Sequence, residues 1–540
     1  MENTKIIENT KINTYLGQKG YTIPKNEISI EKQKQLRNDL TIKPVSHGAP
    51  PGGNSQVSFP AYRESSNKFY VPHYYGVENF GAPKEYKISE GVNVDLEFAG
   101  TLRDYQEPVV NKFIDHCNNV KYGGGLLELP CAWGKTSASL YILSKLKKKT
   151  LVIVHKEFLM NQWIERIQQF LPKARIGKIQ GQIIDIDDKD IVIGMLQSLS
   201  MKEYPASVFE SFGLTIIDEV HHISSEVFSN SLFKLVTKYM LGLSATMNRK
   251  DGTTHVFKMF LGDVIFKGKR DEQLAVTVRA IEYQVDDDEF NEVKLDYRGN
   301  VAYSTMISKL CEYNRRSEFI LKVLGDMLQE NPAQQIMVLA HNKNILKYLH
   351  DAIQHRNIAT VGYYIGGMKE KALKETEGRK VVIATYAMAA EALDIKTLTT
   401  LIMATPKTDI EQSVGRILRE KHSNPIVVDI IDSHDTFKNQ WRKRKTFYKK
   451  ENYKIIYTTL PKYNPDTTTS GWTLVFNPVS KDCLIKNVNK DKNIKKNISV
   501  KSNSSSDKSI ANDSDEEVEE EPEKPKDKYL AGVCFLKFKK

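Results

Sequence analysis

The residues of this chain that could do chemistry begin in a short stretch, LPCAWGKT, at residues 129–136. Gly134 allows a sharp turn, Lys135 can reach the β- and γ-phosphates of a nucleotide, and the Thr136 hydroxyl can ligate magnesium. The start of a following helix would add free N–H donors. The usual pattern, GxxxxGK(S/T), has glycine where this chain has Leu129. A GKT tripeptide alone therefore leaves open an ordinary strand-to-helix turn.

Two neighbouring carboxylates, Asp218 and Glu219, follow an apolar run about 80 residues further on. Asp218 is suited to hold magnesium, directly or through water, and Glu219 to orient or deprotonate an attacking water. Such a pair could also be a solvated turn. Because it ends an apolar run in the same series of strands and helices as GKT, it predicts the second half of a site for ATP and magnesium.

The elements that must position these residues follow from the rhythm of the sequence. Short apolar runs alternate with amphipathic stretches from Leu102 to about Phe266, and the rhythm resumes up to about Asp432. This alternation is typical of strands and helices in a parallel sheet. We therefore predict an α/β fold with two such units in tandem.

The chain is expected to divide into five parts. These are an N-terminal accessory module at 1–100, an ATP-binding lobe at 101–270, a connector at 271–304, a C-terminal lobe at 305–455, and a C-terminal extension at 456–540. Within the extension, residues 487–528 pass from lysine, asparagine and serine to an acidic run. That composition cannot bury enough apolar area to offset the entropy of ordering, so we expect a disordered tail.

Composition narrows the class of protein. With 540 residues and 40% apolar residues, the chain can fill ordinary cores. No apolar run approaches the roughly 18 residues of a membrane span, and the polar start lacks the core of a secretory signal, so an intracellular protein is expected. Five scattered cysteines without a CxxC pair argue against a zinc site. The net charge of +11 permits a polyanionic partner or simply a well-solvated surface.

Four motifs, LPCAWGKT, DEVHH, LGLSAT and QSVGRILR, occur in the order of motifs I, II, III and VI of the superfamily 2 helicases. Between about Leu102 and Tyr453 the chain resembles the group that contains the XPB translocases, phage UvsW and the helicases of large DNA viruses, poxvirus-type transcription-termination helicases included. The resemblance implies two RecA-like lobes, ATP and magnesium as cofactors, and nucleic acid as partner.

The resemblance also implies roles for individual residues. Catalytic roles fall to Glu219, Arg416, Arg419 and Gln412. ATP binding falls to Gln106, Pro130, Cys131, Ala132, Trp133, Gly134, Lys135, Thr136, Ser137 and Asp394, and magnesium binding to Thr136 and Asp218. Coupling between lobes falls to His221, Ser244 and Thr246, and nucleic-acid contact to His155, Gln197, Arg249, His341 and Thr385.

Arg416 and Arg419 are three residues apart and would share one face of a helix. A guanidinium from the second lobe can stabilise charge on the γ-phosphate in the transition state. An isolated RxxR is more often a surface ion-pair helix, but the position of this pair favours the catalytic interpretation. The basic and aromatic segment at 441–450 suits phosphate neutralisation with base stacking, or a solvated helix.

The chain departs from its relatives at three places. Ala132 and Trp133 replace small residues, so the Trp133 side chain must point away from the phosphates, and Trp133→Gly is expected to leave activity intact or faster. Ala392 replaces a glycine and still leaves Asp394 available. An Arg-Glu-Asp element linked to strand separation in XPB-like proteins reads Arg-Lys-Asp at 249–251, which argues against a duplex wedge there.

Three functions compete on these grounds. The first is an ATP-driven helicase or translocase, on DNA rather than RNA because the motif forms resemble the DNA-directed relatives. The second is the motor of a restriction-type nuclease, although no nuclease cluster of carboxylates and lysine is evident. The third is a binding scaffold without hydrolysis, which the intact Lys135, Asp218, Glu219 and Arg416 disfavour. Transcription termination, recombination and repair, with transcription or replication proteins as partners in a virion or a cytoplasmic factory, remain open, as do polarity and oligomeric state.

Overall fold

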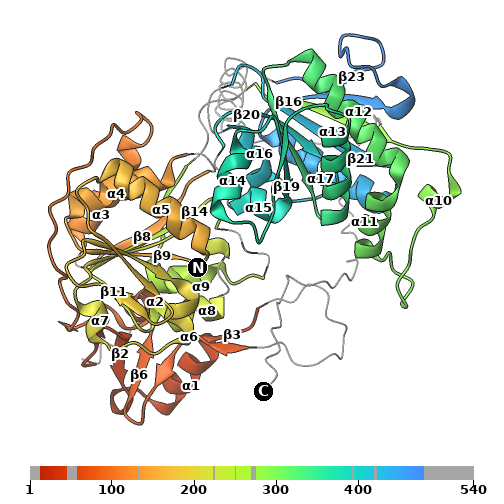
Figure 1. Ribbon diagram of the computed structural model, residues 1–540. Helices are drawn as coiled ribbons and strands as arrows, with labels where there is room; N and C mark the ends of the chain where they lie inside the picture. Colours follow the sequence, from red (N-terminus) through yellow and green to blue (C-terminus); the bar gives the residue numbers. More distant parts are fainter. Residues whose placement is uncertain are drawn as a thin grey trace, which may run out of the picture. The chain divides into compact units, whose positions relative to one another are not determined.

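The computed structural model describes residues 12–44, 58–120, 122–130, 133–222, 225–247, 249, 251–268, 275–391, 395–418 and 422–478. Of these, residues 12–268 belong to one compact unit and 275–478 to a second (Figure 1). The expected disordered tail at 487–528 lies outside the described residues. So do four of the candidate site residues, Cys131, Ala132, Asp394 and Arg419.

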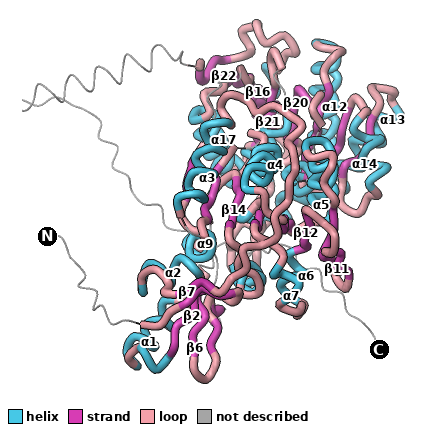
Figure 2. Tube along the Cα trace, turned by 90° about the vertical axis from the view of Figure 1, so that its left-hand side faces the viewer, coloured by secondary structure: helices cyan, strands magenta, loops and turns pink. Residues whose placement is uncertain are grey.

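The first unit begins with a small α/β module. Its five-stranded sheet has the order β5-β6-β2-β1-β7. The strands are β1 (Tyr15–Gly17), β2 (Gly20–Pro24), β5 (Arg63–Glu64), β6 (Lys68–Val71) and β7 (Glu85–Tyr86), with β3 (Thr41–Ile42) and β4 (Phe59–Pro60) paired apart. The helices are α1 (Ile30–Asp39) and α2 (His73–Phe80), and Figure 2 shows both helices close to the strands β2, β6 and β7 of this module.

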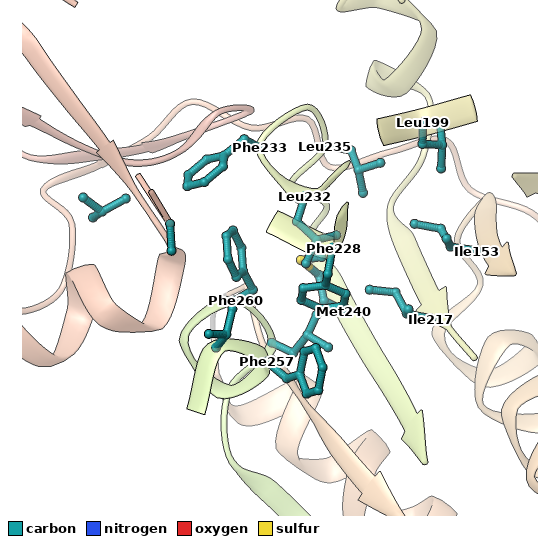
Figure 3. Close-up of a cluster of buried hydrophobic side chains, with 14 of the residues drawn as sticks. Ile153, Leu199, Ile217, Phe228, Leu232, Phe233, Leu235, Met240, Phe257 and Phe260 are labelled. Carbon is teal, nitrogen blue, oxygen red and sulfur yellow. The ribbon is translucent and has the colours of Figure 1, made fainter. Parts of the chain in front are cut away.

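The module does not have a core of its own. Leu16 of β1 and Phe69 of β6 are wholly buried, and buried residues alternate with half-buried ones along β6, as period-two patterning requires. They belong to the same buried cluster as Phe228, Phe233 and Phe260 of the following α/β lobe. Figure 3 shows Phe228 and Phe257 beside Met240, and the ring of Phe260 contacts those of both Phe228 and Phe233. The module and the lobe are therefore joined by continuous apolar packing.

The lobe that follows is an eight-stranded sheet of order β11-β10-β12-β9-β13-β14-β8-β15. Its strands are β8 (Gly124–Glu128), β9 (Thr150–Val154), β10 (Ile176–Gln180), β11 (Ile183–Asp185), β12 (Ile191–Met195), β13 (Leu214–Ile217), β14 (Tyr239–Ser244) and β15 (Val264–Lys267). The helices are α3 (Glu107–Asn119), α4 (Lys135–Leu146), α5 (Glu157–Phe170), α6 (Leu196–Met201), α7 (Ser207–Glu210), α8 (Ser225–Leu232) and α9 (Thr254–Leu261), with the 3-10 turn η2 (Val220–His222).

Seven of these strands run parallel, and only the edge strand β11 is antiparallel to its neighbour. Every residue of β9 and β14 is buried, as expected where helices cover both faces of a parallel sheet. The consecutive strands β8 and β9 are separated in the sheet by β14 and β13. Such a reversal of strand order opens a crevice at the carboxyl ends of the strands, where α/β proteins bind ligands.

The second unit repeats this architecture with the order β18-β19-β17-β20-β21-β16-β22-β23. Its strands are β16 (Thr277–Tyr283), β17 (Gln335–Ala340), β18 (Val361–Tyr364), β19 (Val381–Thr385), β20 (Leu398–Met403), β21 (Ile426–Asp432), β22 (Lys454–Thr459) and β23 (Thr473–Phe476). The helices are α10 (Asp288–Asn291), α11 (Tyr303–Glu312), α12 (Asn314–Glu330), α13 (Lys343–His355), α14 (Glu370–Glu377), α15 (Tyr386–Glu391), α16 (Glu411–Val414) and α17 (Asp435–Lys450), with the 3-10 turns η3 (Gly415–Leu418) and η4 (Leu460–Lys462).

The predicted α/β fold with two mostly parallel sheets is confirmed, but the segments distribute differently from the sequence divisions. The segment expected as a connector at 271–304 supplies β16, which pairs along its whole length with β21. The segment expected as an extension supplies β22 and β23. Among the described residues, no helix is long and apolar enough to cross a membrane.

Candidate nucleotide-binding site

The candidate site of the first unit lies along the carboxyl edge of its sheet. The phosphate-loop stretch follows β8, Asp218 and Glu219 follow β13, and the LSAT segment ends β14. Because these three strands are adjacent and parallel, the residues that follow them meet at the same edge. Residues far apart in the sequence are thereby brought together.

Gly134 has a backbone conformation and surroundings that favour glycine. Its φ of +90° lies in the left-handed region, and a Cβ there would lie 2.5 Å from the side-chain nitrogen of Gln106. Gln106 is buried, and its Nε2 donates to the carbonyl oxygens of Trp133 at 3.0 Å and Gly134 at 3.3 Å. Its Oε1 accepts from the backbone N–H of Arg103 at 3.0 Å. Gln106, which the resemblance assigns to ATP binding, therefore braces the phosphate loop.

Trp133, the unusual residue of the loop, is only 7% exposed and lies in a core cluster with Val109 and Leu140. Its ring lies 5.4 Å from that of Tyr105, centroid to centroid. This packing keeps the indole within the protein core. Glycine at this position would leave a large void under the loop, so Trp133→Gly is expected to cost stability, while its effect on turnover stays a prediction.

We expect Trp133→Gly to lower the free energy of unfolding of the first unit by about 3–5 kcal/mol, the usual cost of truncating a buried tryptophan. Chemical denaturation followed by circular dichroism measures this loss. Trp133→Phe, which keeps an apolar ring, should lose much less. An unchanged unfolding midpoint for the glycine variant would contradict the packing role.

A chain of polar contacts joins the three motifs. Lys135 Nζ lies 2.8 Å from Glu219 Oε1, and both side chains are mostly buried. Glu219 Oε2 lies 3.4 Å from His221 Nδ1, which in turn lies 2.7 Å from the hydroxyl of Ser244. The Ser244 hydroxyl also accepts from the Thr246 backbone N–H at 3.3 Å. A nucleotide phosphate would therefore compete with Glu219 for Lys135. A shift of the Glu219 carboxylate would alter its contact with His221 and, through His221, the contact with the Ser244 hydroxyl.

Glu219 also has an unusual backbone. Its φ of +48° lies in the left-handed region, which costs a residue with a side chain about 1 kcal/mol or more. The backbone N–H of Glu219 donates to Asp218 Oδ1 at 3.0 Å. Strain of this kind persists where the surroundings fix it and is common at active sites.

Asp218 is buried and is held by Trp163, whose indole N–H donates to Oδ2 at 2.9 Å. Burial, followed by the negative charge of Glu219, raises the pKa of Asp218 to about 6, while Lys135 and the Trp163 hydrogen bond oppose the rise. A cation would favour the ionised form. The Asp218 carboxylate and the Thr136 hydroxyl are oxygen donors of the type that magnesium prefers, so these residues fit the metal.

The contact from Trp163 was missed by sequence reasoning. Trp163 lies on α5 and is 1% exposed. Its burial could be expected from the amphipathic pattern of that helix. Its partner could not, since the hydrogen bond spans 55 residues.

The nucleic-acid residues predicted in this unit lie at or near the same edge. His155 directly follows β9, and its carbonyl accepts from Gln197 Nε2 at 2.7 Å. Arg249 donates to the carbonyl of His221 at 2.6 Å and pairs with Asp251 at 2.5 Å. Its guanidinium thus braces the segment after β14, and contact with nucleic acid stays a prediction for all three.

In the second unit, the described candidate residues lie at the end of β19 or on the segments that follow β17 and β20. His341 directly follows β17, and Thr385 ends the adjacent parallel strand β19. Gln412 lies on α16, and Arg416 lies on the 3-10 turn η3, where it is 8% exposed. Arg416 therefore lies in a 3-10 turn after a short α-helix, and the expected shared face with Arg419 is not tested because Arg419 lies outside the described residues.

The basic segment at 441–450 forms most of α17. Its lysines at 443, 449 and 450 are exposed, but Trp441 and Tyr448 are buried in the core. These two rings are therefore not available for base stacking. Phosphate neutralisation by the exposed lysines remains a prediction.

Comparison with known proteins gives relatives over most of the chain. A family described as "Type III restriction enzyme, res subunit" matches residues 99–249. A protein of Acanthamoeba polyphaga mimivirus, named as an ATP-dependent RNA helicase, is 35% identical over 457 residues, which cover 82% of this chain and 86% of the relative. An African swine fever virus protein of the same designation is 27% identical over 417 residues, covering 72% and 80%. The crystal structure of T4 UvsW aligns with 84% of this chain and 100% of its own, at 17% identity and a TM-score of 0.32.

Proposed function

We propose that this chain hydrolyses ATP to drive movement along nucleic acid. The proposal starts from the family: the chain belongs to the superfamily 2 helicases, in the group containing UvsW and the helicases of large DNA viruses. One observation carries the proposal. Lys135, Glu219 and the buried Asp218 lie together at the carboxyl edge of a parallel sheet. A 2.8 Å ion pair joins Lys135 to Glu219, and the backbone N–H of Glu219 donates to the carboxylate of the adjacent Asp218. These are the groups that bind phosphates and activate water.

In the proposed reaction, Lys135 and the N–H groups at the start of α4 bind the β- and γ-phosphates. Glu219 orients the attacking water and accepts its proton. Thr136 and Asp218 would hold magnesium, which when bound offsets the negative charge of the phosphates. Pro130, Ser137 and Gln106 flank this site, and the Gln106 contact with the loop carbonyls supports a role in setting the loop shape.

The second unit completes the proposed cycle. Arg416, with Arg419 and Gln412, stabilises charge that develops on the γ-phosphate. Binding and loss of nucleotide alternately close and open the two lobes on a strand. The strand is contacted by His155, Gln197, Arg249, His341 and Thr385. His221, Ser244 and Thr246 pass the state of the nucleotide site to the rest of the molecule, which the contact chain from Lys135 to Ser244 supports.

We propose DNA as the strand, on the form of motifs I and II. RNA is the second candidate, because the mimivirus and African swine fever virus relatives are named as RNA helicases. The motor of a restriction-type nuclease is the third, after the name of the matching family. All three candidates use the same ATP site. They differ in whether DNA or RNA stimulates ATP hydrolysis and in whether DNA is cut.

ATP turnover measured with single- and double-stranded DNA and with RNA of equal length tests the proposal. We expect DNA to stimulate turnover most, with a rate that rises with DNA length and tolerates base changes, because backbone contacts dominate. Stimulation should fall steeply with salt. Stimulation by RNA alone would overturn the DNA assignment, and no stimulation by any strand would overturn the motor. Digestion of DNA in divalent metal would favour the nuclease.

A further inference from the structure

A loop in the second unit accepts hydrogen bonds from side chains of four helices. We call residues Ala404–Lys407 the β20 loop, since they follow β20 and lead to α16 and η3, which carry Gln412 and Arg416. Each of its carbonyl oxygens accepts a side-chain hydrogen bond from a different helix. The donors are Arg316 of α12 at 2.7 Å, Tyr386 of α15 at 2.6 Å, Tyr303 of α11 at 3.4 Å and Arg444 of α17 at 3.0 Å.

The two arginines that hold the ends of the loop are themselves fixed. Arg316 is wholly buried and makes bonds of 2.6 and 2.9 Å to Asp432. Arg444 is 1% exposed and makes two bonds of 2.8 Å to Asp429. Buried ion pairs whose charged groups are hydrogen-bonded are rigid, because separating the two partners would leave an unpaired buried charge. The β20 loop therefore has little freedom to move within this unit.

Thr405, at the centre of the loop, reaches the residue that follows β17. Its hydroxyl oxygen accepts from the backbone N–H of His341 at 3.0 Å and lies 2.8 Å from the ring atom Nδ1 of the same histidine. Thr405 is wholly buried, so its hydroxyl hydrogen needs an acceptor within the protein. Nδ1 satisfies that need if it carries no proton.

Two further contacts define the surroundings of the His341 ring. Tyr386 packs against it, with 4.9 Å between ring centroids, while its buried hydroxyl donates to the carbonyl of Thr405. Partial removal of water from the ring, with a smaller effect of the positive charge of Lys407, lowers the pKa of His341 to about 4. The ring is therefore neutral at pH 7. Since Nδ1 accepts from Thr405, the single ring proton belongs on Nε2.

We propose that Thr405 is a positioning residue that fixes His341 as the Nε2–H tautomer, so that the exposed histidine presents a neutral N–H donor to a phosphate oxygen of bound nucleic acid. The inference rests on the proposed function, because it gives that strand contact its chemistry. A neutral N–H donor can bind the phosphates of a nucleic-acid backbone without adding a fixed positive charge to the protein. The same threonine belongs to the loop that leads to Arg416, so strand contact and the segment of Arg416 share one anchor.

The first test is direct and needs no variant of Thr405. Nitrogen-15 NMR of the full-length protein labelled at histidine distinguishes the two neutral tautomers, and the His341 signals are assigned by their absence in His341→Asn. We expect the pattern of a protonated Nε2 and an unprotonated Nδ1 between pH 6 and pH 8. A protonated Nδ1 would overturn the proposal.

The second test is functional. We expect Thr405→Val to raise the DNA concentration for half-maximal ATPase stimulation about tenfold, as for one lost hydrogen bond to a charged group, whereas Thr405→Ser, which keeps the hydroxyl, stays near wild type. His341→Ala should have a similar effect, and the double variant Thr405→Val/His341→Ala should add little to it. An unchanged half-maximal concentration for Thr405→Val, or fully additive effects, would overturn the proposal.

Failure of this inference differs from failure of the proposed function. If no strand stimulates the wild-type ATPase, the motor proposal falls while the tautomer measurement still applies. If DNA stimulates wild type and Thr405→Val equally, the motor proposal stands and the role of Thr405 falls. Thermal unfolding of each variant, followed by circular dichroism, identifies a loss that comes from misfolding.

Discussion

Lys135→Ala should lower ATP turnover on the order of 10²–10³-fold or more, because it removes a fixed positive charge from the phosphates. The same change leaves Glu219 without the ammonium group that lies 2.8 Å from its carboxylate. Steady-state ATP hydrolysis with saturating DNA measures the effect, and nucleotide binding followed by fluorescence should weaken as well.

A matched control for this variant is available on the same helix. Lys145 is exposed near the end of α4, so Lys145→Ala removes a charge of the same kind away from the nucleotide site. We expect that control to keep wild-type turnover. Hydrolysis at the wild-type rate by Lys135→Ala would remove the basis for the phosphate-loop assignment.

Glu219→Gln should lower turnover on the order of 10²–10⁴-fold while ATP still binds, since glutamine keeps the size of the side chain but cannot accept a proton. The neutral amide also removes a charge that raises the pKa of Asp218, so Asp218 is more readily ionised in the variant. We expect a stable complex of protein, ATP and DNA, measured by retention of labelled ATP after gel filtration.

Arg416→Ala serves as the contrasting variant, because its proposed contact forms mainly in the transition state. It should lose turnover with much less effect on ATP affinity. Glu226→Gln, an exposed carboxylate on α8, is the matched control for Glu219 and should behave as wild type. Normal turnover in both Glu219→Gln and Arg416→Ala would contradict the two-lobe motor.

Most of the fold could be predicted from local patterns in the sequence. Strands such as β9 and β14 are buried throughout and mostly apolar because both faces of a parallel sheet are covered, and this pattern is visible in the sequence itself. The GKT and Asp-Glu motifs could be assigned for a related reason. Their chemistry requires a short backbone turn and particular residue types in a row, which is information held within a few positions.

Boundaries were less well determined, because pairing between distant strands has no local signature. The strand β16 lies between β21 and β22 in the sheet, more than a hundred residues from either in sequence. Its alternation of polar and apolar residues did not distinguish a central strand from a connector. Only the pairing with β21 over Thr277–Tyr283 decides its place.

The site shows the same division between local and tertiary information. Residue types and spacing predicted Lys135, Asp218 and Glu219, because each follows a recognisable strand. The indole of Trp163 on Asp218 and the hydroxyl of Thr405 on His341 depend on contacts across 55 and 64 residues. Such contacts arise when sheets and helices pack, since packing fixes the distance and direction of each donor. The sequence therefore determined which groups can do the chemistry, and the tertiary structure decided which neighbours hold them in place.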